Sequence, residues 1–186
     1  MSDEILPGQA GYKGPTFTLK NRLKRIAWHI TWLILARWTP PFMHEWRSIL
    51  LRSFGARIGK GVHVYPSVSI WAPWNLIIED AAGVGPKAQL YSMAPIHIGK
   101  RAVISQGAHI CAGTHDYRLE NFPLVAKPVF IGDRAWICAS AFVGPGVTVG
   151  EGAILSAMGC SFTDLDPWCI YIGNPAIKSK IRKILI

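Results

Sequence analysis

Charged residues are scarce in this sequence of 186 residues, in which Asp, Glu, Lys and Arg together make up 17% and apolar residues 50%. A chain with so much apolar surface to bury is expected to fold, and this composition excludes an intrinsically disordered protein. The length corresponds to one domain with short appendages, which excludes a large multidomain assembly.

Acidic residues are the rarer of the two charged groups, since 11 Asp and Glu stand against 20 Lys and Arg. Residues 1–60 hold ten basic and three acidic residues, residues 61–176 hold six and eight, and residues 177–186 hold four basic residues. A nucleic-acid binder normally carries a basic stripe across its folded face. The slightly acidic middle of the chain therefore predicts no nucleic-acid partner.

Long hydrophobic runs and paired cysteines are also missing. The most apolar early run, residues 26–38, is too short to span a bilayer. The first 25 residues lack the apolar region and the small-residue cleavage site of a signal peptide, so we expect none. The four cysteines form no Cys-x-x-Cys pair, which is typical of reduced packing residues in a cytoplasmic protein.

A six-residue repeat occupies most of the chain. It places Ile, Leu or Val at fourteen successive lead positions, with a two-residue slip after Ile70 and another after Leu90: Ile58, Val64, Ile70, Ile78, Val84, Leu90, Ile98, Ile104, Ile110, Ile131, Ile137, Val143, Val149 and Leu155. A small residue usually follows four positions later. A period of six does not keep one face of a helix, so the pattern predicts short parallel strands wound as a three-sided solenoid over residues 58–176.

The repeat is interrupted once and then ends. About thirteen extra residues separate Ile110 from Ile131, which predicts a loop insertion near 114–129 that leaves the solenoid wall. After Gly173-Asn174-Pro175-Ala176, the apolar residues Ile177, Ile181 and Ile184 alternate with basic ones. This spacing predicts a short amphipathic helix over residues 177–186.

Residues 1–57 form a separate N-terminal segment that combines aromatic and basic residues, among them Trp28, Trp38, Phe42, Lys20 and Arg22. The composition favours one or two helices. Such helices suit peripheral contact with the inner face of a membrane, and the same aromatic stripe would equally suit packing against the first coil or a neighbouring subunit.

The hexad spacing resembles that of the hexapeptide-repeat acyltransferases, and this resemblance implies a left-handed parallel β-helix. The insertion opening on Thr114-His115-Asp116 and the Gly-Asn-Pro-Ala ending look like those of the sugar and polysaccharide O-acetyltransferases. The flank, with Trp38-Thr39-Pro40 and Phe54-Gly55-Ala56, resembles the colanic-acid-type exopolysaccharide acetyltransferase branch. The resemblance implies acetyl-CoA as co-substrate, a saccharide acceptor, and a homotrimer with active sites between subunits.

Acetyl transfer to a hydroxyl requires a base, and imidazole suits that role because its ordinary pKa lies near neutrality. His115 matches the family's catalytic His. Asp116 is expected either to orient or charge-stabilise the imidazole, or to serve as a turn residue or substrate contact. Because no nucleophile other than Cys111 stands near His115, the sequence favours direct transfer over an acyl-enzyme.

The resemblance also implies residues for the two substrates. Trp136, Ala139, Ala157 and Lys180 match positions that bind the coenzyme, although Trp136 would also suit simple packing and Lys180 a solvated basic face. Gly85 and Met93 stand where many sugar acetyltransferases carry an Asn and an acidic residue that bind the acceptor. Tyr91, Ser92 and Tyr117 are candidate substitutes.

Two alternatives belong to other functional classes. A γ-carbonic-anhydrase-like zinc enzyme would use three imidazoles, and His97, His109 and His115 lie in the corresponding part of the chain. Their spacing does not match the closely paired ligands of that family, so we expect no metal. A β-helix without catalytic activity that scaffolds an assembly is the other alternative.

Overall fold

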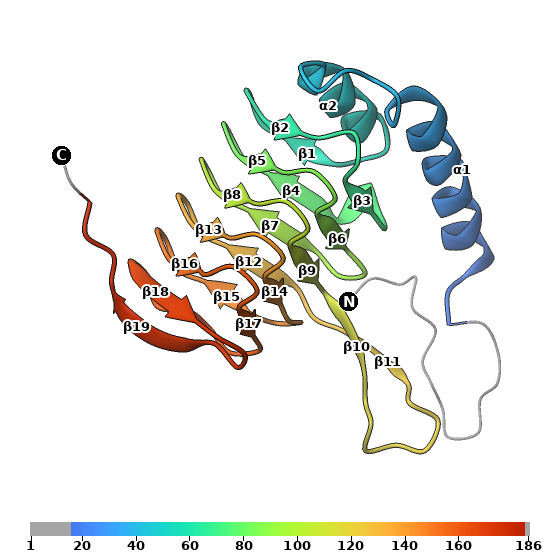
Figure 1. The fold of residues 1–186 in the computed structure, drawn as a ribbon. Coiled ribbons are helices and arrows are strands. Elements are labelled where there is room, and N and C mark those ends of the chain that lie inside the picture. Colours follow the sequence, from blue (N-terminus) through green and yellow to red (C-terminus); the bar gives the residue numbers. More distant parts are fainter. Residues whose placement is uncertain (1–15, 185–186) are drawn as a thin grey trace.

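The computed structural model describes residues 16–184, and the chain forms a solenoid of short parallel strands with two helices at its N-terminal end (Figure 1). Each of the first five coils contributes one strand to each of three faces. The first face contains β1 (Arg57–Ile58), β4 (Leu76–Ile78), β7 (Ile96–Ile98), β12 (Val129–Ile131) and β15 (Thr148–Val149).

The other two faces repeat the arrangement. The second face contains β2 (His63–Val64), β5 (Gly83–Val84), β8 (Val103–Ile104), β13 (Trp136–Ile137), β16 (Ile154–Leu155) and β18 (Cys169–Ile172), with β19 (Ile177–Ile181) at its edge. The third face contains β3 (Ser69–Ile70), β6 (Gln89–Tyr91), β9 (His109–Cys111), β14 (Phe142–Val143) and β17 (Cys160–Ser161). The solenoid predicted from the hexads is therefore confirmed.

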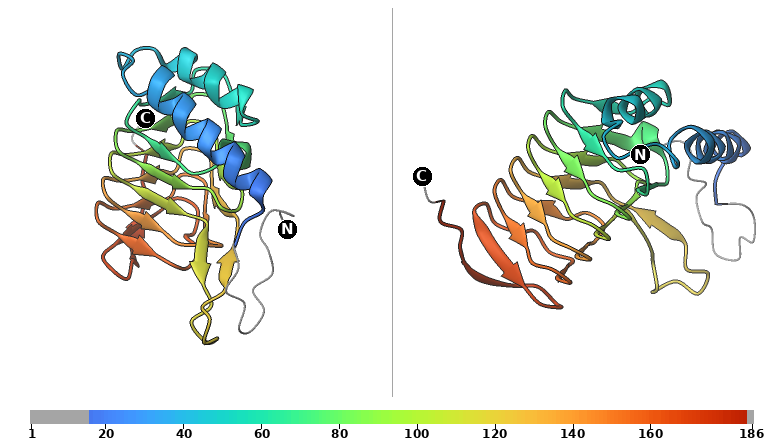
Figure 2. Two further views of the ribbon diagram at one scale, coloured as in Figure 1. Left: turned by 90° about the vertical axis from the view of Figure 1, so that its right-hand side faces the viewer. Right: turned by 45° about the horizontal axis from the view of Figure 1, so that its top comes forward.

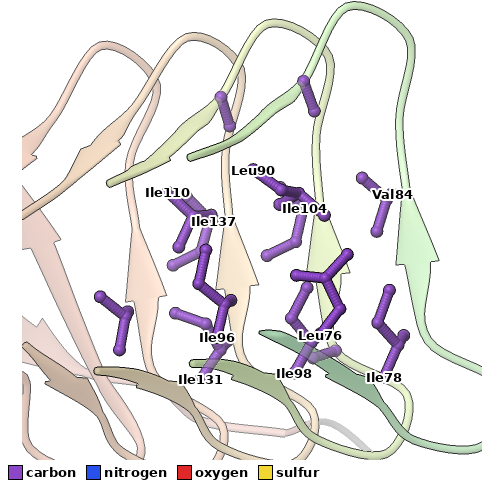
Figure 3. Close-up of a cluster of buried hydrophobic side chains, with 14 of the residues drawn as sticks. Leu76, Ile78, Val84, Leu90, Ile96, Ile98, Ile104, Ile110, Ile131 and Ile137 are labelled. Atoms are coloured by element: carbon purple, nitrogen blue, oxygen red, sulfur yellow. The ribbon is translucent and has the colours of Figure 1, made fainter. Parts of the chain in front are cut away.

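The lead residues of the hexads form the core. Ile78 pairs with Ile98 and Ile98 with Ile131, so side chains from successive coils stack in the interior (Figure 3). Alanines such as Ala82, Ala102 and Ala135 are buried next to the corners. The central coils thus bury one aliphatic side chain per face, and coils stabilise one another mainly through their nearest neighbours.

The N-terminal segment is helical, as predicted, and covers the first coil. It contains α1 (Leu19–Leu35) and α2 (His44–Ser53), followed by the short 3-10 helix η1 (Pro73–Asn75) within the coils. Trp28 is fully buried, and its indole N–H donates to the carbonyl of Ile70 over 2.9 Å. Arg47 of α2 is also buried and donates through Nε to the carbonyl of Val64 over 2.6 Å. These contacts cover the open end of the solenoid and satisfy its free carbonyl groups.

No helix within residues 16–184 is both long enough and apolar enough to cross a membrane.

The loop insertion expected near 114–129 forms a β-hairpin. Strand β10 (Gly113–His115) pairs antiparallel with β11 (Leu124–Ala126), and the hairpin projects from the corner between the third and first faces (Figures 1 and 2).

The C-terminal helix predicted over residues 177–186 is wrong for residues 177–181. These residues form β19, which pairs antiparallel with β18. The last parallel strand leaves a row of unpaired backbone groups, and an added strand satisfies them whereas a helix would not. Edge pairing therefore overrides the helical spacing of Ile177 and Ile181.

Candidate active site

His115 lies at the end of β10, opposite Leu124 of β11, and its side chain is exposed. Its Nδ1 lies 2.5 Å from the carbonyl oxygen of Phe122 in the hairpin turn. A carbonyl oxygen only accepts hydrogen bonds, so the neutral imidazole carries its proton on Nδ1. The lone pair is then on Nε2 of this exposed residue, which is the arrangement that a general base requires.

Asp116, the neighbour that the sequence offered as a partner for the imidazole, pairs with Arg118 instead. Nε of Arg118 donates to Oδ1 of Asp116 over 2.8 Å and Nη2 donates to Oδ2 over 2.7 Å. The Arg118 guanidinium lowers the pKa of the Asp116 carboxyl to about 2. In this arrangement the orientation of the His115 ring comes from a backbone carbonyl, and Asp116 orders the turn of the hairpin.

The root of the hairpin is closely packed. A Cβ atom on Gly113 would lie 2.4 Å from Sδ of Met93 and 3.3 Å from Cε1 of Tyr91. The thiol of Cys111 is buried and donates to the carbonyl of Gly113 over 3.1 Å. Burial raises the pKa of this thiol, so it stays protonated at neutral pH.

The predicted acceptor residues fall into two groups. Tyr91, Ser92, Met93 and Tyr117 lie at the hairpin or its root, and Tyr117 is 82% exposed in the turn. Ser92 is fully buried and its hydroxyl bridges the backbone N–H and carbonyl of Ala72 over 3.0 and 2.8 Å, so it serves the wall of the solenoid. Gly85 lies elsewhere, at the corner between the second and third faces.

The predicted coenzyme residues cluster around that second corner. Trp136 is in register with Ile154, Ile154 with Ile170, and Ile170 with Lys180, so Trp136 and Lys180 lie in one row of the second face. The indole N–H of Trp136 donates to the hydroxyl of Ser105 over 2.8 Å. Ala139 and Ala157 follow β13 and β16 in consecutive coils, and the amide of Met158 donates to the carbonyl of Ala139 over 2.9 Å.

Basic side chains near the C-terminus differ in whether they have ion-pair or hydrogen-bond partners. Lys178 pairs with Asp166 over 2.9 Å, and Arg182 donates to the carbonyls of Arg134 and Gly152 over 3.0 and 2.9 Å. Lys180 is exposed and has no ion-pair partner within residues 16–184. Of these three cations, Lys180 is the one most available to a phosphate.

The hairpin and the coenzyme corner lie apart in a single chain. The hairpin follows β9 at one edge of the third face, whereas Ala139 precedes β14 at the other edge. Figure 1 shows the hairpin and the end of the second face on different sides of the solenoid. One chain alone therefore does not bring His115 to Trp136 and Lys180.

The three histidines of the zinc alternative are also separated. His97 is on the first face, where its Nε2 lies 2.7 Å from the Glu79 carboxylate. His109 is on the third face between the rings of Tyr91 and Phe142, and His115 is on the hairpin. Residues 16–184 contain no group of three or more side chains placed to hold a metal ion.

Sequence reasoning missed two parts of the site. The carbonyl of Phe122 acts through the backbone, so no side-chain signal identifies it, and only the hairpin brings it to His115. The second part is Arg118. Its position, two residues after Asp116 in the insertion, is a sequence signal for an ion pair with that carboxylate.

The architecture matches a known fold. The solenoid superposes on a hexapeptide-repeat acetyltransferase from Vibrio cholerae in complex with acetyl coenzyme A, with a TM-score of 0.81, 22% identity and coverage of 90% of this chain and 91% of that one. It also superposes on a galactoside acetyltransferase in complex with coenzyme A, with a TM-score of 0.81, 20% identity and coverage of 89% and 84%. The fold is that of the hexapeptide-repeat acetyltransferases, the left-handed parallel β-helix expected from the sequence.

The sequence comparison narrows the class to a family. The chain is 40% identical over 162 residues to the colanic acid biosynthesis acetyltransferase WcaF of Escherichia coli K12, an alignment that covers 87% of this chain and 89% of that protein. An acetyltransferase of Schizosaccharomyces pombe is 34% identical over 95 residues, which is 50% of this chain and 45% of that protein. No family model matches the chain. This protein belongs to the family of colanic-acid-type acetyltransferases, and it is an acetyltransferase.

Proposed function

We propose that this protein transfers the acetyl group of acetyl-CoA to a hydroxyl of a saccharide in exopolysaccharide or related surface glycan biosynthesis. One observation carries the proposal. His115 is an exposed residue on a projecting hairpin, and its Nδ1 is hydrogen-bonded to the carbonyl of Phe122, which leaves Nε2 as the acceptor.

His115 supplies the base for the reaction. Its Nε2 takes the proton of the acceptor hydroxyl while the hydroxyl oxygen attacks the thioester carbonyl. The tetrahedral intermediate then collapses, the carbon–sulfur bond breaks, and the imidazolium returns the proton to the departing thiolate. The products are an acetyl ester and coenzyme A.

Transfer is direct, through a ternary complex of enzyme and both substrates. An acyl-enzyme would require a nucleophile beside His115, and the thiol of Cys111 is buried, protonated and bound to the carbonyl of Gly113. Initial-rate plots against both substrates are expected to intersect, whereas parallel lines would indicate an acyl-enzyme.

The complete site forms between subunits of a homotrimer. The hairpin and the coenzyme corner lie at opposite edges of the third face, so the hairpin of one subunit serves the corner of its neighbour. In that arrangement the coenzyme is bound by Trp136, Ala139, Ala157 and Lys180. The acceptor site is lined by Tyr91, Met93 and Tyr117 of one subunit together with Gly85 of the neighbouring corner.

The function is tested on the product itself. Mass spectrometry of surface polysaccharide from cells with and without the gene should show the loss of one acetyl substituent per repeat, restored by the wild-type gene and not by a gene that encodes His115→Ala. Unchanged acetylation in the deletion strain would refute the proposed acceptor class.

A further inference from the structure

Helix α1 carries apolar side chains on two opposite faces. Trp28 and Trp32 are buried against the solenoid. On the side half a turn away, the exposed side chains are again apolar: Leu19, Leu23, Ile26, Ile30, Leu33 and Ile34. The solvent side of an ordinary surface helix is polar. Residues 16–184 provide nothing that covers this second face.

The apolar surface continues past the end of the helix. Trp38 and Phe42 are each 80% exposed in the connection to α2. The indole N–H of Trp46 donates to the carbonyl of Leu35 over 2.8 Å, which fastens α2 beside the end of α1. We call the six exposed residues of α1 together with Trp38 and Phe42 the outer apolar face.

Positive charge surrounds the outer apolar face. Residues 16–60 contain nine Lys and Arg, of which Arg47 is buried, and a single acidic residue, Glu45, which is paired with Arg52 over 2.6 Å. Lys20 and Arg22 are exposed and lie on either side of the apolar stripe of α1, because successive residues of a helix are turned by about 100°. The surface therefore combines an apolar centre with cationic margins.

The charge pattern discriminates between candidate occupants. A second copy docked face to face would bring the same cationic margins together without acidic partners, and such like-charge contacts oppose association. An anionic lipid surface offers hydrocarbon for the apolar centre and phosphate groups for the margins. Tryptophan such as Trp38 is favoured at the level of the headgroups, and phenylalanine such as Phe42 suits the apolar side of an interfacial segment.

We propose that the outer apolar face binds the surface of an anionic lipid bilayer, with α1 lying in the plane of the interface. The face is already formed before binding, because the hydrogen bond from Trp28 to Ile70 and the burial of Trp32 hold α1 against the first coil. Binding therefore requires little ordering of the segment.

Bilayer binding would also orient the active-site hairpin. Figures 1 and 2 show α1 and the β10–β11 hairpin on the same side of the solenoid. A protein held through α1 presents the hairpin next to the membrane, where a lipid-linked saccharide would be found. This consequence rests on the proposed function, whereas lipid binding itself does not.

The test uses the full chain and vesicles of phosphatidylcholine, with and without phosphatidylglycerol. The protein should sediment with the anionic vesicles at low salt and be released at high salt. Ile26→Glu combined with Ile30→Glu should weaken binding by about 100-fold, because two side chains that insert become charged. Lys20→Gln and Arg22→Gln should each weaken it about fivefold at low salt.

A matched control separates the surface from the chemistry of the substitution. Ile177 and Ile181 are 71% and 67% exposed at the opposite end of the solenoid, and Ile177→Glu with Ile181→Glu should leave vesicle binding unchanged. Circular dichroism should show equal folding of both double variants. Vesicle binding needs neither acetyl-CoA nor an acceptor, so its outcome is independent of the enzymatic proposal.

Either of two results would overturn the inference. One is a wild-type protein that does not sediment with anionic vesicles at low salt. The other is a pair of Ile→Glu substitutions in α1 that changes the oligomeric mass in light scattering and leaves vesicle binding intact, which would assign the face to another copy of the chain.

Discussion

His115 acquires its chemistry from one backbone hydrogen bond. The carbonyl of Phe122 holds the proton on Nδ1 and leaves Nε2 as the acceptor. A neighbouring residue in the sequence would have been the simpler partner, but Asp116 is engaged by Arg118. The imidazole proposed as the base could be placed from the Thr-His-Asp opening of the insertion, whereas its hydrogen-bond partner could not.

We expect His115→Ala to lower kcat by roughly 10²- to 10⁴-fold, because a positioned general base contributes about that much. The variant should keep its fold and oligomeric mass, since the side chain is exposed and takes no part in the core. Steady-state kinetics with acetyl-CoA and the acceptor measure the loss. Turnover close to that of the wild type would reject His115 as the base.

Asp116→Asn should have a much smaller effect on kcat than His115→Ala, because Asp116 pairs with Arg118. The carboxyl has its pKa lowered to about 2, so its pairing favours the folded hairpin fully above the ordinary pKa near 3.8 and is lost as the pH falls toward 2. Proteolysis of the hairpin at neutral pH should be faster in Asp116→Asn. An equal loss of kcat in the two variants would instead assign Asp116 to the imidazole.

At the scale of elements, the hairpin depends on the fit between Gly113 and the coil beneath it. A side chain introduced at residue 113 would collide with the side chain of Met93, and the thioether would have to move. Met93, a residue expected to bind the acceptor, is only 6% exposed under the hairpin root.

Gly113→Ala should therefore destabilise the fold by about 1–3 kcal/mol, the usual cost of adding a methyl group to a closely packed site. The combination of Gly113→Ala with Met93→Ala should cost less than the sum of the two single changes, because each relieves the steric conflict or fills the space left by the other. Thermal unfolding of the three variants measures the coupling. Strictly additive effects would contradict this packing.

Strand β19 has a secondary structure that differs from the one its local sequence pattern predicts. Ile177 and Ile181 have helical spacing, yet both lie on a strand whose five residues are all exposed. Helical amphipathicity describes one segment in isolation, while the unpaired edge of β18 exists only after the last coil has formed. The hexads were predictable for the opposite reason, because each repeat carries its own inward residue and its own corner.

The whole molecule decides whether the site is complete. His115 and the row from Trp136 to Lys180 occupy different sides of one solenoid, so the proposed site requires a neighbour.

Two inactive variants should restore activity when they are assembled together. His115→Ala removes the base, and Ala139→Trp fills the coenzyme corner. Random co-assembly should recover about a quarter of the wild-type activity, because one interface in four then combines an intact hairpin with an intact corner. The control is a mixture of the two variants purified separately as assembled trimers. Because their subunits do not exchange, this mixture should give no recovery. No recovery in co-assembled trimers would place the whole site within one chain.

The sequence by itself determined the solenoid, the helical N-terminal segment, the insertion and the position of His115, because repeats and motifs are local patterns that each segment carries alone. Tertiary structure alone decided the hydrogen bond from His115 to Phe122, the strand at the C-terminal edge, and which apolar face of α1 is buried and which is exposed. Each of these depends on groups that folding brings together from different segments, or on an edge that exists only once the coils are stacked. Local residue spacing does not encode such contacts.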